Sequence, residues 1–171
     1  MKIGIFSDSY KPYVSGVVNS IELFTRELRA LGHEVYIFAP SYPHYLDEEP
    51  GVFRFRSVQA PSNRDFSVAI PFSLKFAPVL RQFKLDLIHV HSPFILGQVG
   101  AIQARRLNIP LIFTYHTLYE QYVHYVPISP NLTRELVVRI SRRFCNRCDT
   151  VITPTEQVKE LLDDYGVSAP I

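Results

Sequence analysis

Polar side chains that could bind a ligand stand directly after three of the expected strands. Histidine imidazoles and serine, threonine and tyrosine hydroxyls bind sugars and phosphates through hydrogen bonds. In an open parallel sheet, ligands bind outside the carboxyl ends of the strands, so side chains that follow different strands can meet there. The residues that we expect to line such a site are Ser9, Tyr10, Ser15, His91, Ser92, His116, Thr117 and Tyr119.

Three histidines lie at or near the ends of two expected strands, and we expect one of them to be structural and two to contact a ligand. His89 lies within the strand expected at 85–90, and we expect it to be buried with its hydrogen bonds satisfied. His91 faces the same side of that strand but stands at its end, where we expect a ligand to reach it. His116 has the equivalent place after the next strand. Two histidines on adjacent loops favour a site role for His116 over a purely structural one.

A helix that begins at Gly16 is a candidate anion site. Residues 3–6 form an apolar run typical of a buried strand, a polar loop covers 7–15, and apolar residues then recur at helical spacing. A helix N-terminus at the carboxyl edge of a strand offers free N–H groups and a positive dipole end, which bind phosphate. The pattern therefore predicts a phosphate site at Gly16 and Val17.

The same region excludes two common kinds of nucleotide site. Its loop has one glycine rather than Gly-x-Gly-x-x-Gly, and the strand expected at 34–39 ends in Phe38-Ala39-Pro40, with no acid to bind a ribose diol. The Gly-x-x-x-x-Gly-Lys motif of NTPases is also missing from the sequence. These features favour a diphosphate whose nucleoside is held elsewhere.

Strand and helix patterns alternate along the whole chain. The expected strands are 3–6, 34–39, 52–56, 85–90, 110–115 and 150–153, with another from 168; the expected helices begin at 16 and span 72–83, 94–107, 131–146 and 155–165. Such alternation requires right-handed crossovers and a mainly parallel sheet. We therefore predict an α/β fold with a Rossmann-like, doubly wound sheet flanked by helices and an edge strand at 52–56.

Composition limits the class of protein further. The chain has 171 residues, enough for one domain with a sizeable core, and a net charge of only +2, which argues against a nucleic-acid partner. It contains no apolar run of the roughly 20 residues that a membrane span needs and no recognisable export signal. Cys145 and Cys148 have no second ligand pair nearby, so we expect reduced structural thiols in a cytoplasmic protein.

Four short motifs, in order along the chain, carry a resemblance to a known family. They are Ile3-Gly4-Ile5-Phe6-Ser7-Asp8 with Pro12 and Gly16-Val17, then Leu31-Gly32-His33-Glu34-Val35, then Asp86-Leu87-Ile88-His89-Val90-His91-Ser92-Pro93, then Thr114-Tyr115-His116-Thr117. Together they resemble the N-terminal domain of family 4 (group 1) retaining glycosyltransferases of the GT-B fold. Within that family, the segments 12–18 and 91–94 are most similar to the diacylglycerol glucosyltransferases of bacterial glycolipid synthesis.

The resemblance implies a two-domain enzyme that transfers a hexose from a nucleotide-sugar to an acceptor hydroxyl with retention and without a cofactor or metal. Residues 1–171 would be the N-terminal, acceptor-side domain, and its own C-terminal, donor-binding domain would be absent. Gly16 and Val17 would approach the donor diphosphate, and His116 would line the reaction centre as the catalytic residue. Ser15 stands where many relatives have a second glycine, and the paired-glutamate motif is not found, so we expect the chain alone to be inactive.

A lipid acceptor such as diacylglycerol would require contact with a membrane. Residues 66–83 combine apolar and basic side chains, and residues 134–147 combine five arginines with an apolar stripe, a pattern typical of helices on an anionic membrane surface. With such contact, the enzyme would be peripheral on the inner face of the cell membrane. A core helix with a solvated basic face would give the same pattern at 134–147.

Two other functions fit the same motifs. One is a family member that acts on a soluble or polysaccharide acceptor, and the other is a non-catalytic module that binds a phosphoryl ligand. We expect the loop 41–51 and the tyrosine-rich residues 119–125 to shape acceptor specificity.

Overall fold

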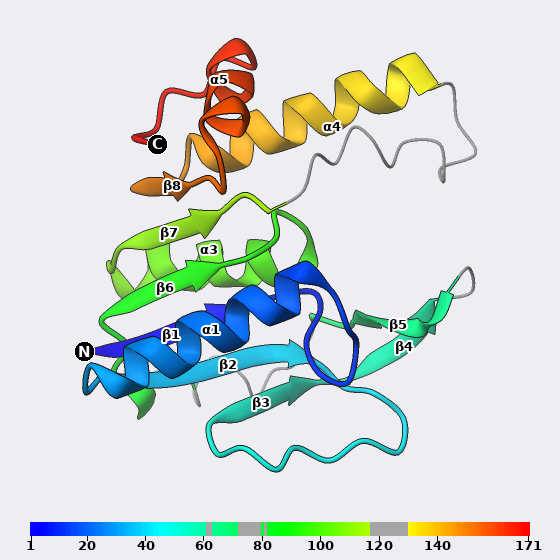
Figure 1. Cartoon of the computed structure of the whole chain (residues 1–171), viewed down its shortest axis with the longest axis vertical. Helices are drawn as coiled ribbons and strands as arrows, with labels where there is room; N and C mark the ends of the chain where they lie inside the picture. Colours follow the sequence, from blue (N-terminus) through cyan, green and yellow to red (C-terminus); the bar gives the residue numbers. More distant parts are fainter. Residues whose placement is uncertain (61–62, 72–79, 81, 117–129) are drawn as a thin grey trace.

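The computed structural model describes the chain except residues 61–62, 72–79, 81 and 117–129 (Figure 1). At its centre is a parallel six-stranded sheet in the order β3-β2-β1-β6-β7-β8. Its strands are β1 (Lys2–Phe6), β2 (Glu34–Pro40), β3 (Val52–Phe55), β6 (Leu87–Val90), β7 (Leu111–Thr114) and β8 (Thr150–Ile152). This order confirms the predicted Rossmann-like, doubly wound sheet, and β3 lies at its edge as expected.

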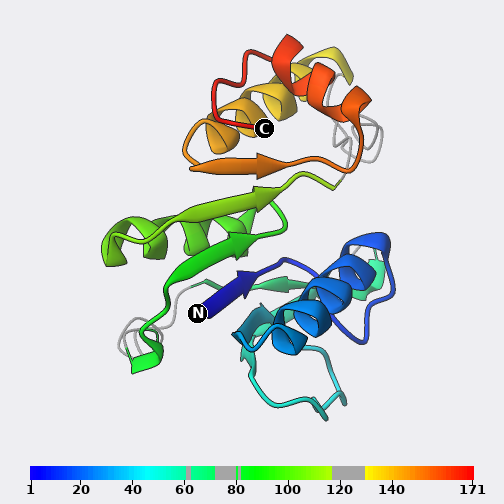
Figure 2. The same ribbon diagram turned by 60° about the vertical axis from the view of Figure 1, so that its left-hand side comes forward.

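Helices cover both faces of the sheet because the central strands are apolar on both sides. The helices are α1 (Gly16–Ala30), α3 (Ile95–Leu107), α4 (Pro130–Cys145) and α5 (Glu156–Asp164). On one face, Ile5 of β1 packs in a cluster with Ile21 of α1. On the other, Phe6 belongs to a larger core with Leu96 of α3 and residues of α4 and α5. Figure 2 shows α1 and α3 on opposite sides of β1 and β6.

A β-hairpin that the sequence analysis did not predict follows β3. Its strands β4 (Ser57–Ala60) and β5 (Asn63–Ala69) pair antiparallel and form a separate two-stranded sheet. The hairpin projects beyond the ends of β2 and β3 in Figure 1. Phe66, Val68 and Ile70 are apolar at every second position, which is the spacing of a strand. The sequence analysis counted them as part of the apolar segment 66–83 and therefore did not predict β5.

Two further predicted elements, the strand from residue 168 and the helix at 72–83, are not found as predicted or lie mainly outside the described residues. The expected strand from residue 168 is not formed, and that prediction is wrong; a single bond from the Val151 N–H to the Pro170 carbonyl, at 2.8 Å, joins this segment to β8. The helix predicted at 72–83 falls mainly on residues outside the described part. Within the described ranges, no helix has the length and apolar character needed to cross a bilayer.

The two cysteines lie in the core rather than at a reactive site. Cys145 and Cys148 are free thiols and both are buried. Burial raises the pKa of each thiol to about 12, so the nucleophilic thiolate is strongly disfavoured at neutral pH. The structural reading of this Cys-x-x-Cys pair is confirmed.

Candidate functional site

Several of the predicted site residues follow β1 and β6, the two strands between which the sheet order changes direction. Strands β2 and β3 lie on one side of β1, whereas β6, β7 and β8 lie on the other. In doubly wound sheets, ligands bind in the crevice at this switch point, outside the carboxyl ends of the strands. The loop after β1 carries Ser9 and Tyr10 and leads into α1, and the loop after β6 carries His91 and Ser92. The two loops therefore flank the crevice.

His91 and His116 contact each other at this edge. Nδ1 of His91 lies 2.7 Å from Nε2 of His116, and the ring centroids are 5.0 Å apart. Backbone bonds hold both loops, because the His91 N–H donates to the Phe6 carbonyl at 2.9 Å and the Tyr115 N–H donates to the Ile152 carbonyl at 2.9 Å. His91 is only 1% exposed, so our expectation that a ligand reaches it directly is not met, whereas His116 is partly exposed.

His89 lies behind this pair and has the supporting place that the sequence predicts. It is buried, and its Nε2 lies 2.7 Å from Oγ1 of Thr114 on the neighbouring strand. Its ring centroid is 4.2 Å from that of His91. Phe24 of α1 packs edge-on against both rings, at 5.4 Å from His89 and 6.0 Å from His91. The helix that begins at Gly16 therefore packs directly against the histidines.

Burial keeps all three imidazoles neutral. Burial lowers the pKa of His116 to about 4, and burial together with His116 lowers the pKa of His89 to about 4. Burial, with the two neighbouring histidines, lowers the pKa of His91 well below its usual value. An effective general base has a pKa near the working pH, so His116 is better suited to hydrogen bonding than to proton abstraction.

Asp8, which the sequence analysis did not select, joins the two loops across the switch point. Its Oδ2 accepts a hydrogen bond from the Ser92 hydroxyl, and its Oδ1 accepts one from the Leu96 N–H at 2.8 Å, in the first turn of α3. A carboxylate at this position complements the helix dipole. Burial nevertheless raises the pKa of Asp8 against these bonds. Ser92 is 8% exposed and its hydroxyl is committed to Asp8, so it supports the loop.

None of the residues that the structure describes crowds the first residue of α1. Ser15 caps the helix by accepting a hydrogen bond from the Val18 N–H at 3.3 Å, which leaves Gly16 and Val17 at the first two helical positions. The N–H groups at such positions have no partner inside an α-helix. A Cβ at Gly16 would meet no described atom within 4 Å, whereas one at Gly97 would lie 1.7 Å from the Ser92 carbonyl oxygen.

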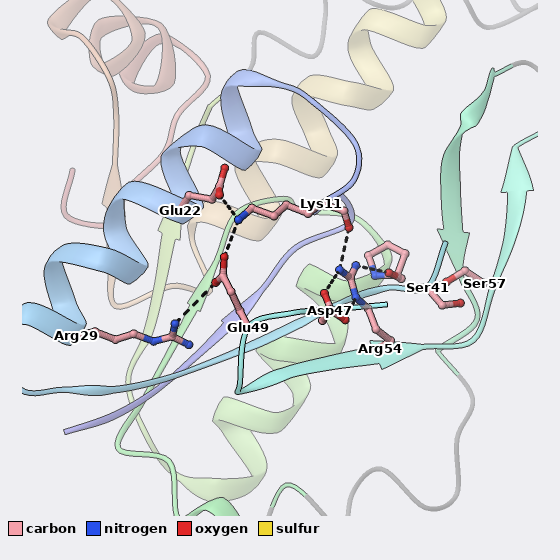
Figure 3. A network of polar contacts seen from close by, with 9 residues as sticks. Lys11, Glu22, Arg29, Ser41, Asp47, Glu49, Arg54 and Ser57 are labelled. Carbon is pink, nitrogen blue, oxygen red and sulfur yellow. Dashed lines mark hydrogen bonds and ion pairs between the residues drawn. The ribbon is translucent and has the colours of Figure 1, made fainter. Parts of the chain in front are cut away.

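Ion pairs and hydrogen bonds of Arg54 and Lys11 connect the loop 41–51, strand β3 and the loop that follows β1 (Figure 3). Arg54 of β3 grips Asp47 through two bonds, Nε–Oδ2 at 2.8 Å and Nη2–Oδ1 at 2.5 Å, and also donates to the Lys11 carbonyl at 2.8 Å. Lys11 in turn contacts Glu49 at 2.6 Å and also Glu22 of α1. The two loops therefore form one connected unit.

Tyr10 packs against Arg54 of this unit. The Arg54 guanidinium lies over the rings of Tyr10, Tyr42 and Tyr45, at 5.4, 5.8 and 5.5 Å. Tyr10 is 1% exposed, and burial raises its pKa to about 12. As with His91, this burial does not meet the expectation that Tyr10 lines the crevice directly, and its ring instead packs against the Arg54 guanidinium.

Two of the predicted site residues lie outside the described part of the chain. Thr117 and Tyr119 belong to the segment 117–129, which the structure does not describe. In the remainder of the chain, no group of three or more histidine, cysteine or acidic side chains could hold a metal ion. The expectation of a metal-free reaction stays a prediction.

The arginine-rich helix α4 has both buried and exposed side chains. Towards its end, Phe144 is 1% exposed and packs edge-on against Phe113 of β7, with centroids 5.0 Å apart. Earlier in the helix, Leu136 is 52% exposed. The side chains of Arg139, Arg142 and Arg143 are exposed and line a shallow groove with Glu135 and Val138. The core reading therefore holds for the face of α4 that carries Phe144, whereas Leu136 and the three arginines, two of them in the last turn, are exposed to solvent.

Comparisons with known proteins extend these observations. A family model described as Glycosyltransferase Family 4 matches residues 14–171. The chain is 39% identical over 170 residues to an alpha-monoglucosyldiacylglycerol synthase of Streptococcus pneumoniae, a match that covers 98% of this chain and 38% of that protein. It is 34% identical over 166 residues to a protein of the same name from Acholeplasma laidlawii, covering 92% of this chain and 42% of the relative.

A solved structure supports the fold alone. The UDP-GlcNAc 2-epimerase from Methanocaldococcus jannaschii superposes with a TM-score of 0.58 at 16% identity, over 98% of this chain and 43% of that one. The chain thus spans about two-fifths of the length of the curated relatives and of the structural neighbour, at 38%, 42% and 43%.

Proposed function

The chain belongs to glycosyltransferase family 4, and from that premise we propose that it is the N-terminal, acceptor-side domain of an enzyme that transfers a hexose from a nucleotide-sugar to an acceptor hydroxyl with retention. The observation that carries the proposal is the shared position of two features at the switch point. The uncrowded N-terminus of α1 at Gly16 and the His91–His116 pair follow β1, β6 and β7 at one edge of the sheet.

Gly16 and Val17 would act on the donor diphosphate. Negative charge accumulates on the diphosphate as the glycosidic bond to it breaks, so N–H groups aimed at it stabilise the transition state more than the ground state. The dipole of α1 acts in the same direction. Because a Cβ at Gly16 would meet no described atom within 4 Å, the missing side chain leaves room for a ligand to approach the backbone.

His116 would bind the substrates rather than accept their protons. Its partly exposed position and its low pKa, about 4, suit a neutral hydrogen-bonding group beside the transferred sugar or the acceptor. Ser9, Ser15 and the loop 41–51 would border the acceptor side of the same crevice. A metal would not be needed in this scheme, because the helix N-terminus supplies the positive potential.

A lipid such as diacylglycerol is the acceptor that we propose. Two relatives that match nearly the whole chain, at 39% and 34% identity, are named alpha-monoglucosyldiacylglycerol synthases. Such an acceptor would bring the protein to the membrane surface. Among the described groups, Leu136, Arg139, Arg142 and Arg143 of α4 are exposed and could contact anionic lipid there. The segment 66–83, which lies partly outside the described residues, would be a second contact.

An acceptor screen of the full-length protein tests the proposal. Nucleotide-sugars labelled in the hexose would be incubated with diacylglycerol vesicles, a soluble sugar phosphate, an inositol and an oligosaccharide, and the labelled products separated. We expect label in the lipid fraction with retained anomeric configuration. Transfer to a soluble acceptor alone would move the protein to another branch of the family, and the absence of transfer to all acceptors would overturn the enzymatic proposal.

A further inference from the structure

One proton lies between His91 and His116. Its position decides whether His116 presents a hydrogen-bond donor or an acceptor to a substrate. Both rings are neutral, so one of the two facing nitrogens, Nδ1 of His91 and Nε2 of His116, must carry the hydrogen and the other must accept it. Each arrangement also decides whether the second nitrogen of each ring is protonated, because a neutral imidazole has one N–H and one lone pair.

The surroundings of His91 distinguish the two arrangements. Its Nε2 is fully buried and has no hydrogen-bond partner among the described residues. If His116 donated, His91 would carry its own proton on this Nε2, and a buried N–H would remain without an acceptor. If His91 donates, Nε2 is left with a lone pair. A buried N–H without a partner is rarer and more costly than an acceptor without a donor, so donation by His91 is favoured.

We infer that His91 is a positioning residue that donates its Nδ1–H to Nε2 of His116 and thereby holds His116 in the Nδ1-protonated form. His116 then presents an N–H, a hydrogen-bond donor, on the side of the ring that faces away from His91. Within the proposed function, on which this consequence rests, His116 would donate to an oxygen of the transferred sugar or of the acceptor. The assignment of the proton itself does not depend on that function.

The rest of the structure holds His91 in place for this role. Its backbone N–H donates to Phe6 of β1, its ring lies 4.2 Å from that of His89, and Phe24 of α1 packs against it. The ring is 1% exposed, so water does not compete for the Nδ1 hydrogen bond. A buried and fixed donor is what a single tautomer of His116 requires.

Long-range proton–nitrogen NMR correlation of the chain labelled with ¹⁵N at histidine tests the inference directly. The shifts of the two ring nitrogens report which one carries the proton, and the spectra of His91→Asn and His116→Ala assign the signals. At neutral pH we expect His91 and His116 both to be protonated on Nδ1 and bare on Nε2. A His116 ring protonated on Nε2 would overturn the inference, whatever the enzyme does.

Two variants of nearly equal size then connect the tautomer to activity in the full-length protein. His91→Asn retains an amide N–H that can donate to His116, whereas His91→Asp offers only acceptors and draws the His116 proton onto Nε2. We expect His91→Asn to keep the wild-type tautomer and most of its turnover, and His91→Asp to change the tautomer and lower kcat by about tenfold, the loss of one hydrogen bond.

Thermal unfolding of both variants separates positioning from stability. Equal losses of kcat in the two variants, or an unchanged His116 tautomer in His91→Asp, would show that His91 acts only through packing. If the full-length protein transfers no sugar at all, the proposed function fails while the NMR result still decides the tautomer.

Discussion

Arg54 and Asp47 form a bidentate ion pair that joins the edge strand β3 to the loop 41–51. Two hydrogen bonds, of 2.8 and 2.5 Å, connect the guanidinium and the carboxylate, whose side chains are 15% and 18% exposed. The guanidinium also donates to the carbonyls of Pro40 and Lys11, at 2.7 and 2.8 Å. One side chain therefore holds three segments of the site together (Figure 3).

Arg54→Lys should destabilise the chain, because a lysine ammonium cannot form the bidentate pair with Asp47 and also donate to the carbonyls of Pro40 and Lys11. We expect the free energy of unfolding to fall by about 2 kcal/mol or more, in the range for breaking a largely buried pair. Urea denaturation followed by circular dichroism measures the change. Arg139→Lys is the matched control, since its pair with Glu135 is 57% and 68% exposed and should change stability by less than about 0.5 kcal/mol. Equal effects would contradict the anchoring role of Arg54.

Gly16→Ala should separate ligand binding from folding. The added Cβ meets no described atom within 4 Å, so we expect the unfolding free energy to change by less than about 0.5 kcal/mol. If the diphosphate approaches this backbone, the methyl group obstructs it, and kcat/KM of the full-length protein for the nucleotide-sugar should fall about tenfold or more.

Gly100→Ala is the inverse control for that experiment. Its Cβ would lie 2.8 Å from Cγ1 of Val90 and 3.1 Å from the ring of Phe6, so overpacking should cost about 1–3 kcal/mol of stability. A Gly16→Ala protein that loses stability like Gly100→Ala, or that transfers sugar at the wild-type rate, would remove Gly16 from the donor site.

His116→Ala should lower turnover of the full-length protein at least about tenfold, because it removes a hydrogen bond made at the reacting sugar. His33→Ala serves as a control, since His33 lies at the other end of the strands, beside the N-terminal amine at 3.3 Å. Initial rates at saturating nucleotide-sugar measure the effect. Near wild-type turnover in His116→Ala would place this histidine outside the site.

Stability should decrease as pH falls from about 6.5 towards 4. His89 and His116 have a pKa of about 4 when folded against 6.5 as the ordinary value, so the unfolded chain binds more protons in this window. Each such histidine contributes a slope of up to about 1.4 kcal/mol per pH unit, with its stabilisation fully present above 6.5. Asp8, whose pKa is raised, acts in the opposite direction where it titrates.

Urea denaturation at a series of pH values measures this dependence. The His116→Ala variant lacks one of the shifted groups, so its unfolding free energy should decline less steeply than that of the wild type. A wild-type stability that is flat across the window would show that these imidazoles are protonated as readily in the folded chain as in the unfolded one.

The sequence predicted the parallel sheet because its central strands, such as 34–39, are apolar runs of strand length between helical patterns. It also located the position of His116, since the end of a parallel strand is visible in the pattern. It could not show that His91 turns inward, because burial at a strand end depends on which helix covers it, and here Phe24 of α1 does so. Asp8 and Arg54 were missed because their partners, Ser92 and Asp47, are joined to them only by the fold.

Binding to anionic vesicles should depend on the arginines of α4 more than on the protein's overall charge, which is only +2. Arg139, Arg142 and Arg143 are exposed along one groove, and each basic group near an anionic surface contributes about 1 kcal/mol. Replacing Arg142 and Arg143 by Gln should therefore weaken co-sedimentation with vesicles that contain anionic lipid by about tenfold or more, and added salt should weaken wild-type binding likewise. Replacing Arg105 and Arg106 of α3 by Gln removes the same charge from another helix and is the matched control. Equal binding to neutral and anionic vesicles, or equal losses in the two double variants, would mean that α4 is a core helix whose basic face is simply solvated.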